Sequence, residues 1–372
     1  MLTQDHDAIT FTNVPQVPVP SILRGFSAPV ILDYNYSDAQ LLSLLAHDGD
    51  PFNRWEAGQR LALRCALELI AAPAHSTVPA RLNDAYIHAM RTILRHPTLD
   101  PAFKELVLTL PSETYIAEQL ETVDPQQIHT VREAMRLQLA TELYADWEWA
   151  FATHQDVGTY QSDAVSAGRR ALSGLALGFL CLAAAQKNSS NNVVWPGKAL
   201  QHFKDARNMT DRFNALQALV GCGHELADLA LARFHALYKD DSLVLDKWFA
   251  LQAGAPDRNG HVLPVVRKLL THPDFNIRNP NRARSVIFSY CSANPGAFHR
   301  RDAAGYVFWS ESLLELDGIN PQVAARLARA MDRWKRLAEP YRSAAGEALA
   351  RVATRADLST DVREVIDRAL AD

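Results

Sequence analysis

The sequence lacks the residue patterns from which most common catalytic sites are built. Only four of its 372 residues are cysteines, and Cys65, Cys181, Cys222 and Cys291 lie far apart in apolar surroundings. Their spacing excludes a C-x-x-C redox pair and a cysteine metal cluster, and it predicts buried, reduced thiols. The chain also has no P-loop and no G-x-S-x-G nucleophile turn. We therefore predict no catalytic residue, no metal ligand and no cofactor in this chain.

Long apolar runs and a strong charge of one sign are missing too. No uninterrupted run of about 18 apolar residues occurs, so no membrane span is expected. Residues 1–7 carry neither a basic region nor an apolar core, so we predict no signal peptide and a cytoplasmic location. A net charge of −4 argues against nucleic acid as the partner.

The zinc-protease helix H-E-x-x-H is incomplete in this sequence. His224 and Glu225 begin the pattern, but Asp228 stands where the second histidine should be. Two imidazoles four residues apart are needed to reach one metal ion, and no two of the 13 histidines are three or four residues apart. The start of an exposed helix is the preferred interpretation, and a metallohydrolase built on His224 and Glu225 is a hypothesis kept only for testing.

Helix signals are abundant from Ser37 onward. Ser37 and Gln40 form a capping-box pattern ahead of a leucine-rich segment. Six Asp-Pro or Asn-Pro pairs predict helix starts, because Asp or Asn can cap the helix and proline fits its first turn. The prolines of these pairs are Pro51, Pro101, Pro125, Pro280, Pro295 and Pro321. Amphipathic segments of helical length include 52–70, 125–151, 211–219, 242–253 and 303–316.

So many short helices do not fit into one compact bundle. About 330 residues of helices joined by short turns predict an all-α superhelical stack of antiparallel helix pairs, of the HEAT/armadillo type. No strict sequence period is visible, so the repeats are expected to be degenerate. The polar segment 186–192 is predicted to be an exposed loop, either an inert insertion or a partner-binding loop.

The first residues differ from all that follow. Residues 8–12 alternate in polarity, prolines at 15, 18 and 20 oppose a helix, and residues 27–34 again favour an extended chain. One or two strands cannot form a stable sheet alone. This segment is therefore predicted to be the tail of another domain.

Two stretches place arginines in the first turns of a helix, namely residues 279–284 and 320–326. Free backbone N–H groups and the helix dipole favour an anion at such a position. The alternative is that these arginines only pair with carboxylates of neighbouring helices. Between residues 281 and 342 ten Lys and Arg residues face six Asp and Glu residues, so an anionic partner would be met there.

Several segments together resemble the C-terminal region of bacterial aminopeptidase N, a zinc aminopeptidase family of the H-E-x-x-H type. They occur in the family's order and cover most of residues 8–340. The segments that carry the resemblance are 26–30, 52–57, 208–211, 243–252, 279–284, 292–299 and 320–326. None of them is a catalytic motif.

The resemblance implies a non-catalytic domain of a larger enzyme. Residues 1–30 would be the tail of a preceding β-sandwich domain with a linker, and residues 31–372 the helical C-terminal domain. In the family this domain covers the active site, forms the internal cavity that admits short peptides and limits substrate size. Its partners would be the catalytic domain of the same enzyme, which holds the zinc, and the peptides. The G-A-M-E-N loop and the zinc helix are absent here, so we predict no peptidase activity from this chain alone.

By position, Arg284, Gln322 and Arg326 match family residues that face the cavity. An arginine there can hold peptide carbonyls or a C-terminal carboxylate through charge-assisted hydrogen bonds. Arg282 lies two positions from Arg284, on another side of the helix, and is predicted to be a structural ion-pair partner. Tryptophans at helical spacing, among them Trp309 and Trp334, are predicted to be core or inter-helix anchors.

A different class of function stays open. A free-standing α-solenoid scaffold would bind a protein partner on its concave side. The extended N-terminal segment argues against it, because such a scaffold would begin with a polar capping helix. The sequence does not decide the oligomeric state or the peptide preference of a parent enzyme.

Overall fold

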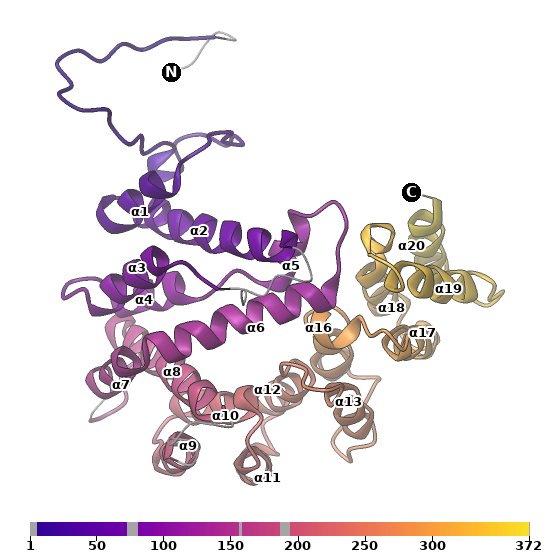
Figure 1. The fold of residues 1–372 in the computed structure, drawn as a ribbon. Coiled ribbons are helices and arrows are strands. Elements are labelled where there is room, and N and C mark those ends of the chain that lie inside the picture. Colours follow the sequence, from indigo (N-terminus) through magenta and orange to yellow (C-terminus); the bar gives the residue numbers. More distant parts are fainter. Residues whose placement is uncertain (1–5, 73–80, 156–157, 187–193, 372) are drawn as a thin grey trace. The chain divides into compact units, whose positions relative to one another are not determined.

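The computed structural model describes residues 6–72, 81–155, 158–186 and 194–371, and the predicted loop at 186–192 lies almost wholly outside them. The chain forms two compact units, Met1–Leu61 and Ala62–Asp372, which are described separately. Figure 1 shows the elements of both.

The first unit contains the extended N-terminal segment and its helical anchor. Its elements are a short 3₁₀ turn (Arg24–Phe26), α1 (Asp38–His47) and the first half of α2 (Pro51–Ala71). Asn53 donates from its side chain to the carbonyl of Ile22 at 3.0 Å, and Ser21 donates to Asp48 at 2.6 Å. No strand forms among residues 6–36, although the alternation predicted one. The physical reason is that a strand needs a hydrogen-bonded partner strand, and none lies beside this segment among the described residues.

The second unit is built from helices in succession. Its first part contains α3 (Asp84–Arg95), α4 (Pro101–Leu108), α5 (Glu113–Glu118), α6 (Pro125–Glu142), α7 (Tyr144–Thr153), α8 (Ala164–Ala184), α9 (Val194–Asp205), α10 (Met209–Cys222) and α11 (Leu226–Tyr238). Its second part contains α12 (Ser242–Ala253), α13 (Val262–Leu270), α14 (Pro280–Ala283), a π-helical turn (Arg284–Phe288), α15 (Ser289–Cys291), α16 (Pro295–Phe298), α17 (Ala304–Asp317), α18 (Pro321–Ala328), two 3₁₀ turns (Arg329–Met331 and Trp334–Arg336), α19 (Tyr341–Ala353) and α20 (Thr360–Ala371).

The predicted helix starts are confirmed. Each of the six prolines is the first residue of a helix, and the Ser37–Gln40 capping box is formed. Asp100, Asp124 and Asn279 each accept hydrogen bonds from two backbone N–H groups of the helix they cap. Asn294 is different, because its side-chain amide donates to the carbonyls of residues 253 and 255 and so ties α16 to the end of α12.

The prediction of one helical segment over residues 125–151 was wrong in one respect. It is interrupted at Leu143, where α6 ends and α7 begins. Leu143 is fully buried, and the indole of Trp147 donates to the carbonyl of Leu139 across the break at 2.9 Å. Periodicity alone could not show this, because both helices bury apolar side chains at the same spacing.

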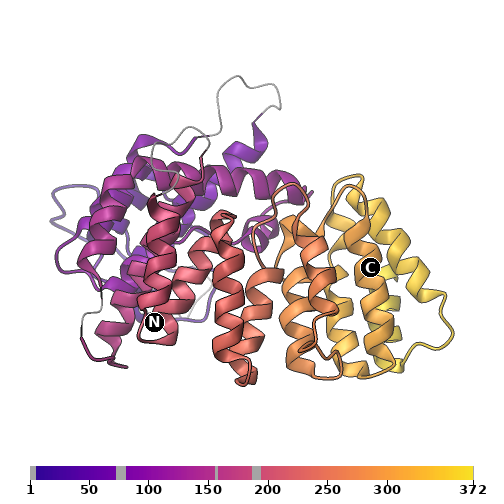
Figure 2. The same ribbon diagram turned by 90° about the horizontal axis from the view of Figure 1, so that it is seen from below.

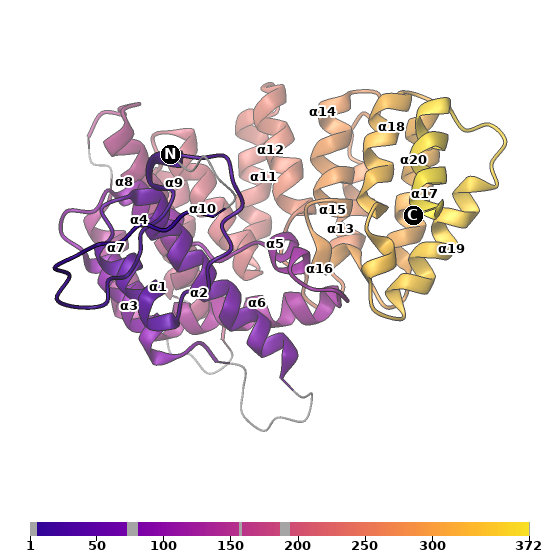
Figure 3. The same ribbon diagram turned by 90° about the horizontal axis from the view of Figure 1, so that it is seen from above.

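Within the second unit, the helices stack side by side in an all-α superhelix, which confirms the predicted fold class. Figure 1 shows them following one another in an arc from α4 to α20, and Figures 2 and 3 show neighbouring axes running roughly antiparallel. The stack is built from sequence neighbours such as α9 and α10, α11 and α12, and α19 and α20. This pattern is typical of helical-repeat proteins, in which each unit buries its apolar face against the next.

Helix α8 is the most central element of the stack and contacts α4, α6, α7, α9 and α10. By length and composition alone it could cross a membrane, but 67% of its apolar window is buried inside the protein. A core helix of this kind passes the same test.

The predicted core is largely confirmed. All four cysteines are buried and free. Trp309 is fully buried, and its indole donates to the carbonyl of Leu327, so that α17 is joined to α18. Trp334 is only half-buried, and its position is described with the pocket below.

Candidate functional site

A pocket of about 450 Å³ lies within the second unit. Its walls come from α5, the first turn of α6, the π-helical turn, α15, α16, α18 and the two 3₁₀ turns that follow α18. Residues far apart in the sequence therefore meet here. Most of the lining is apolar, including Ile128, Phe288, Met331 and Trp334. A pocket of this size, apolar with a few polar groups, is typical of small-molecule and peptide-side-chain sites.

One side of the pocket is fixed by backbone hydrogen bonds between distant segments. Val123 and Leu337 form an isolated parallel bridge. The N–H of Val123 donates to the carbonyl of Arg336 at 2.7 Å, and the N–H of Ala338 donates to the carbonyl of Val123 at 2.8 Å. These bonds hold the loop before α6 against the 3₁₀ turns, so the pocket wall is rigid where the two segments join.

Four arginines line the pocket, and all come from one segment: Arg326, Arg329, Arg333 and Arg336. Three of them have partners. Arg329 pairs with Asp332 at 3.1 Å, Arg333 pairs with Glu118 at 2.8 Å, and Arg336 donates to the carbonyl of Leu120.

Arg326 is the exception. Its exposed side chain has no hydrogen-bond or ion-pair partner among the residues that the structure describes. Its guanidinium can therefore bind an anion without first breaking an existing pair.

Glu113, on α5, connects other parts of the pocket wall. Its two carboxylate oxygens contact the Nδ1 of His129 at 2.7 Å and the backbone N–H of Gly296 at 3.0 Å. The hydrogen bond to Glu113 raises the pKa of His129, so the pair favours a carboxylate beside an imidazolium. Since its charge is balanced within the wall, Glu113 does not cancel the charge of Arg326.

His299 also borders the pocket, but its protonation state is opposite to that of His129. Its Nδ1 lies 2.9 Å from the hydroxyl of Tyr306, and its ring packs edge-on against Phe298. Burial lowers the pKa of His299 to about 4, because its charged form loses hydration. At neutral pH this wall therefore carries a neutral imidazole.

The three residues predicted to face the cavity do not all lie at the pocket. Arg326 lines the pocket, whereas Arg284 and Gln322 do not. Gln322 is exposed one turn before Arg326 on α18, and the half-buried Arg284 donates weakly to Asn281 at 3.3 Å. Phe288 and Cys291, which an α-helix would place on one face with Arg284, do line the pocket, but the turn from 284 to 288 is π-helical, so Arg284 does not share that face. A cavity role for Arg284 and Gln322 stays a prediction.

The prediction for Arg282 is confirmed. Its Nε lies 2.5 Å from Asp246, another of its nitrogens donates to the carbonyl of Asp274, and its guanidinium lies over the ring of Phe249. Only 6% of this side chain is exposed. Arg282 is a structural residue that joins α12, the turn after α13, and α14.

Sequence analysis missed several pocket residues. Arg329, Arg333 and Arg336 appeared only as part of the positive charge of residues 281–342. Trp334 was interpreted as an anchor, and it does donate to the carbonyl of Ala369, yet it also lines the pocket. The cluster of arginines at spacings of three and four around Trp334 was the signal that could have indicated this site.

His224 has a local role in the structure. Its Nδ1 accepts a hydrogen bond from the backbone N–H of Leu226 at 3.2 Å, at the start of α11. This is a local contact, and Asp228 stands where a zinc-protease helix needs its second histidine.

These features define a helical-repeat domain with an apolar, arginine-bordered pocket. Comparisons with known proteins support the helical-repeat architecture. Residues 38–371 match a family described as a domain of unknown function (DUF3458_C) with ARM repeats, and residues 1–35 match a companion family (DUF3458) with an Ig-like fold. The chain belongs to the DUF3458_C family.

The curated relatives that match are bacterial aminopeptidases. The chain is 36% identical over 370 residues to aminopeptidase N of Caulobacter vibrioides, 35% over 369 residues to that of Haemophilus influenzae and 37% over 370 residues to that of Escherichia coli. These alignments cover 99–100% of this chain but only 41% of each relative. The resemblance to the C-terminal region of aminopeptidase N is thereby confirmed.

A solved structure supports the same assignment. The crystal structure of Legionella pneumophila aminopeptidase A in complex with aspartic acid matches with a TM-score of 0.83 and 28% identity. The match covers 97% of this chain and 42% of that chain.

Proposed function

We propose that this chain is the non-catalytic C-terminal domain of a zinc-dependent aminopeptidase and forms part of the cavity that receives short peptides. The relatives' names and the family match support this assignment. Its partners would then be the zinc-containing catalytic domain of the same enzyme and the peptides, in the cytoplasm. The buried, free thiols fit such a reducing compartment.

The single observation that carries the peptide-binding role is the unpaired Arg326 beside an apolar pocket. A short peptide offers a terminal carboxylate for the guanidinium and an apolar side chain for a wall such as Phe288 and Trp334. Residues of the segment 326–336 line the pocket, and we infer that this segment limits the length of the peptide that can be accepted.

Replacing Arg326 by alanine is expected to weaken binding of a tripeptide with a free carboxylate by about 10- to 100-fold, the value of a hydrogen bond to a charged group. Binding can be followed by calorimetry. The unchanged chain should bind the same peptide with a C-terminal amide more weakly than the peptide with a free carboxylate. The Arg326→Ala variant should bind the amide at least as tightly as the acid.

Arg351→Ala is the matched control, because Arg351 is an exposed arginine of α19 outside the pocket. It should leave peptide affinity unchanged, and both substitutions should change the free energy of unfolding by less than about 0.5 kcal/mol. If the amide bound as tightly as the acid, or if Arg326→Ala bound both peptides normally, the proposed carboxylate contact would be wrong.

A further inference from the structure

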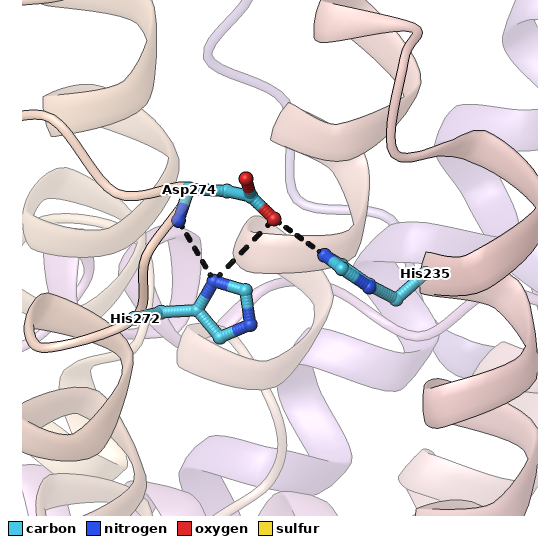
Figure 4. A group of neighbouring side chains, drawn as sticks. All are labelled: His235, His272 and Asp274. Carbon is cyan, nitrogen blue, oxygen red and sulfur yellow. Dashed lines mark hydrogen bonds and ion pairs between the residues drawn. The ribbon is translucent and has the colours of Figure 1, made fainter.

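A second group of chemically active side chains lies away from the pocket, between α11 and the turn after α13. His235 is in the last turn of α11, and His272 and Asp274 follow the end of α13. Figure 4 shows the two imidazoles and the carboxylate pointing toward one another. One ligand atom from each residue lies within 4.8 Å of the other two. Nothing in the pocket or in the proposed peptide-binding role uses these residues.

The distances place Asp274 between the two rings. Its Oδ2 lies 2.6 Å from the Nε2 of His235 and 3.7 Å from the Nδ1 of His272. Two ligands of a tetrahedral zinc ion, each about 2.0–2.2 Å from the metal, are separated by about 3.4 Å. To reach this separation the carboxylate has to move away from His235 by less than about 1 Å, and the two imidazole nitrogens, which lie within 4.8 Å of each other, have to approach by less than about 1.5 Å.

That backbone is held firmly. The N–H of His272 donates to the carbonyl of Leu269, and the N–H of Phe275 donates to the carbonyl of His272. Arg282 donates to the carbonyl of Asp274 from the other side. Ligand positions that the fold fixes in advance lower the entropic cost of binding an ion.

The rings are oriented by aromatic neighbours. The ring of Trp248 lies 5.1 Å from His235 and 5.3 Å from His272, and Phe249 meets His272 edge-on at 5.6 Å. Trp248 is itself fixed by a hydrogen bond from its indole to the carbonyl of Leu231. The aromatic cluster packs against the two imidazoles, while the side chains of all three residues keep 23–39% exposure.

The surrounding charges permit a cation. His235 lies at the C-terminal end of α11, where the helix dipole favours positive charge. Arg282 is the nearest cation, but its charge is balanced by Asp246 at 2.5 Å. A metal would replace two contacts: the hydrogen bond between the Nε2 of His235 and the Oδ2 of Asp274 at 2.6 Å, and the hydrogen bond from the N–H of Asp274 to the Nδ1 of His272 at 3.2 Å.

We propose that His235, His272 and Asp274 bind one divalent transition-metal ion, with water completing its coordination. Two imidazole nitrogens and one carboxylate oxygen favour zinc, cobalt, nickel or copper over magnesium and calcium, which prefer oxygen ligands. The ion would join the end of α11 to the turn after α13. Its binding would stabilise the folded chain, since the unfolded chain does not bring the three ligands together.

The test is calorimetric titration of the whole untagged chain with zinc chloride after removal of metals by a chelator. We expect one zinc ion per chain and a rise in the melting temperature. Asp274→Asn and His235→Gln should each weaken zinc binding at least tenfold. His88→Gln, which changes an exposed histidine of α3, should not affect it. Circular dichroism of the unliganded variants distinguishes a lost ligand from a lost fold.

Substitution with cobalt gives an independent readout. Four- or five-coordinate cobalt bound by the three side chains should show visible absorption that Asp274→Asn lowers and His88→Gln retains. Zinc binding that these ligand substitutions leave unchanged would overturn the proposal. So would the absence of stoichiometric zinc binding, or equal affinity for magnesium.

Discussion

Replacing Arg282 by methionine should lower the free energy of unfolding by about 3–5 kcal/mol, as measured by urea denaturation. The substitution keeps an apolar stem of similar length but leaves Asp246 without its cation, and only 15% of that carboxylate side chain is exposed. It also removes the donor to the carbonyl of Asp274 and the contact with the ring of Phe249. An unpaired buried charge is the main reason for the size of the effect.

Two companion variants separate this charge effect from a general loss of packing. The double variant Arg282→Met with Asp246→Leu should recover most of the loss, because no charge is then left unpaired. Arg284→Met, two positions along the chain, should change stability by less than about 0.5 kcal/mol, since among the described residues its side chain makes one hydrogen bond, to Asn281 at 3.3 Å. A loss below about 1 kcal/mol for Arg282→Met would contradict the structural role of Arg282.

Acidification from pH 7 to pH 4.5 should remove about 2 kcal/mol of stability through His299 alone. Burial lowers the pKa of His299 from 6.5 to about 4 in the folded chain. The unfolded chain therefore binds a proton at a higher pH than the folded chain does. This contribution is complete above pH 6.5 and is lost progressively as the pH falls toward 4. The full pKa shift corresponds to about 3 kcal/mol of stability. The expected loss is smaller because His299 borders the pocket.

The matched variant is His299→Gln, which cannot titrate but can still hydrogen-bond to the hydroxyl of Tyr306. Its stability, measured by urea denaturation at several pH values, should fall less between pH 7 and pH 4.5 than that of the unchanged chain. His129 contributes equally to both proteins, so its effect cancels in the comparison. Its pKa is raised by Glu113, so its contribution is complete below pH 6.5 and is lost only at higher pH. If the free energy of unfolding fell equally with pH in the two proteins, His299 would not be buried in its neutral form and the prediction would be wrong.

Local signals in the sequence predicted much of the fold. The six Asp-Pro and Asn-Pro pairs marked helix starts because capping and the fixed φ of proline act within a few residues. The segment 242–253 coincides with α12, whose start is also capped locally, by the side chain of Asp241. Extended strands before residue 36 were predicted from alternation and did not form, since a strand depends on a distant partner that a local pattern does not specify.

The sites could be predicted only in part. Arg326 was identified through its position in a family segment, but the pocket around it depends on the pairing of Val123 with Leu337, which no local pattern encodes. The proposed metal-binding group was missed because a search for histidines three or four residues apart finds only ligands on one helix. His235 and His272 come from different elements and meet only after α11 and α13 have packed against α12. Long-range packing thus decides both sites.

The most direct test of the proposed function is an aminopeptidase assay with a chromogenic alanine substrate and added zinc. The chain would be measured alone and after mixing with a separately produced catalytic domain that carries the H-E-x-x-H helix. We predict no hydrolysis by the chain alone and a gain of activity on mixing, with a higher KM when the chain carries Arg326→Ala. Zinc-dependent hydrolysis by the chain alone, or a catalytic domain whose activity and KM are unaffected by the chain, would contradict the account.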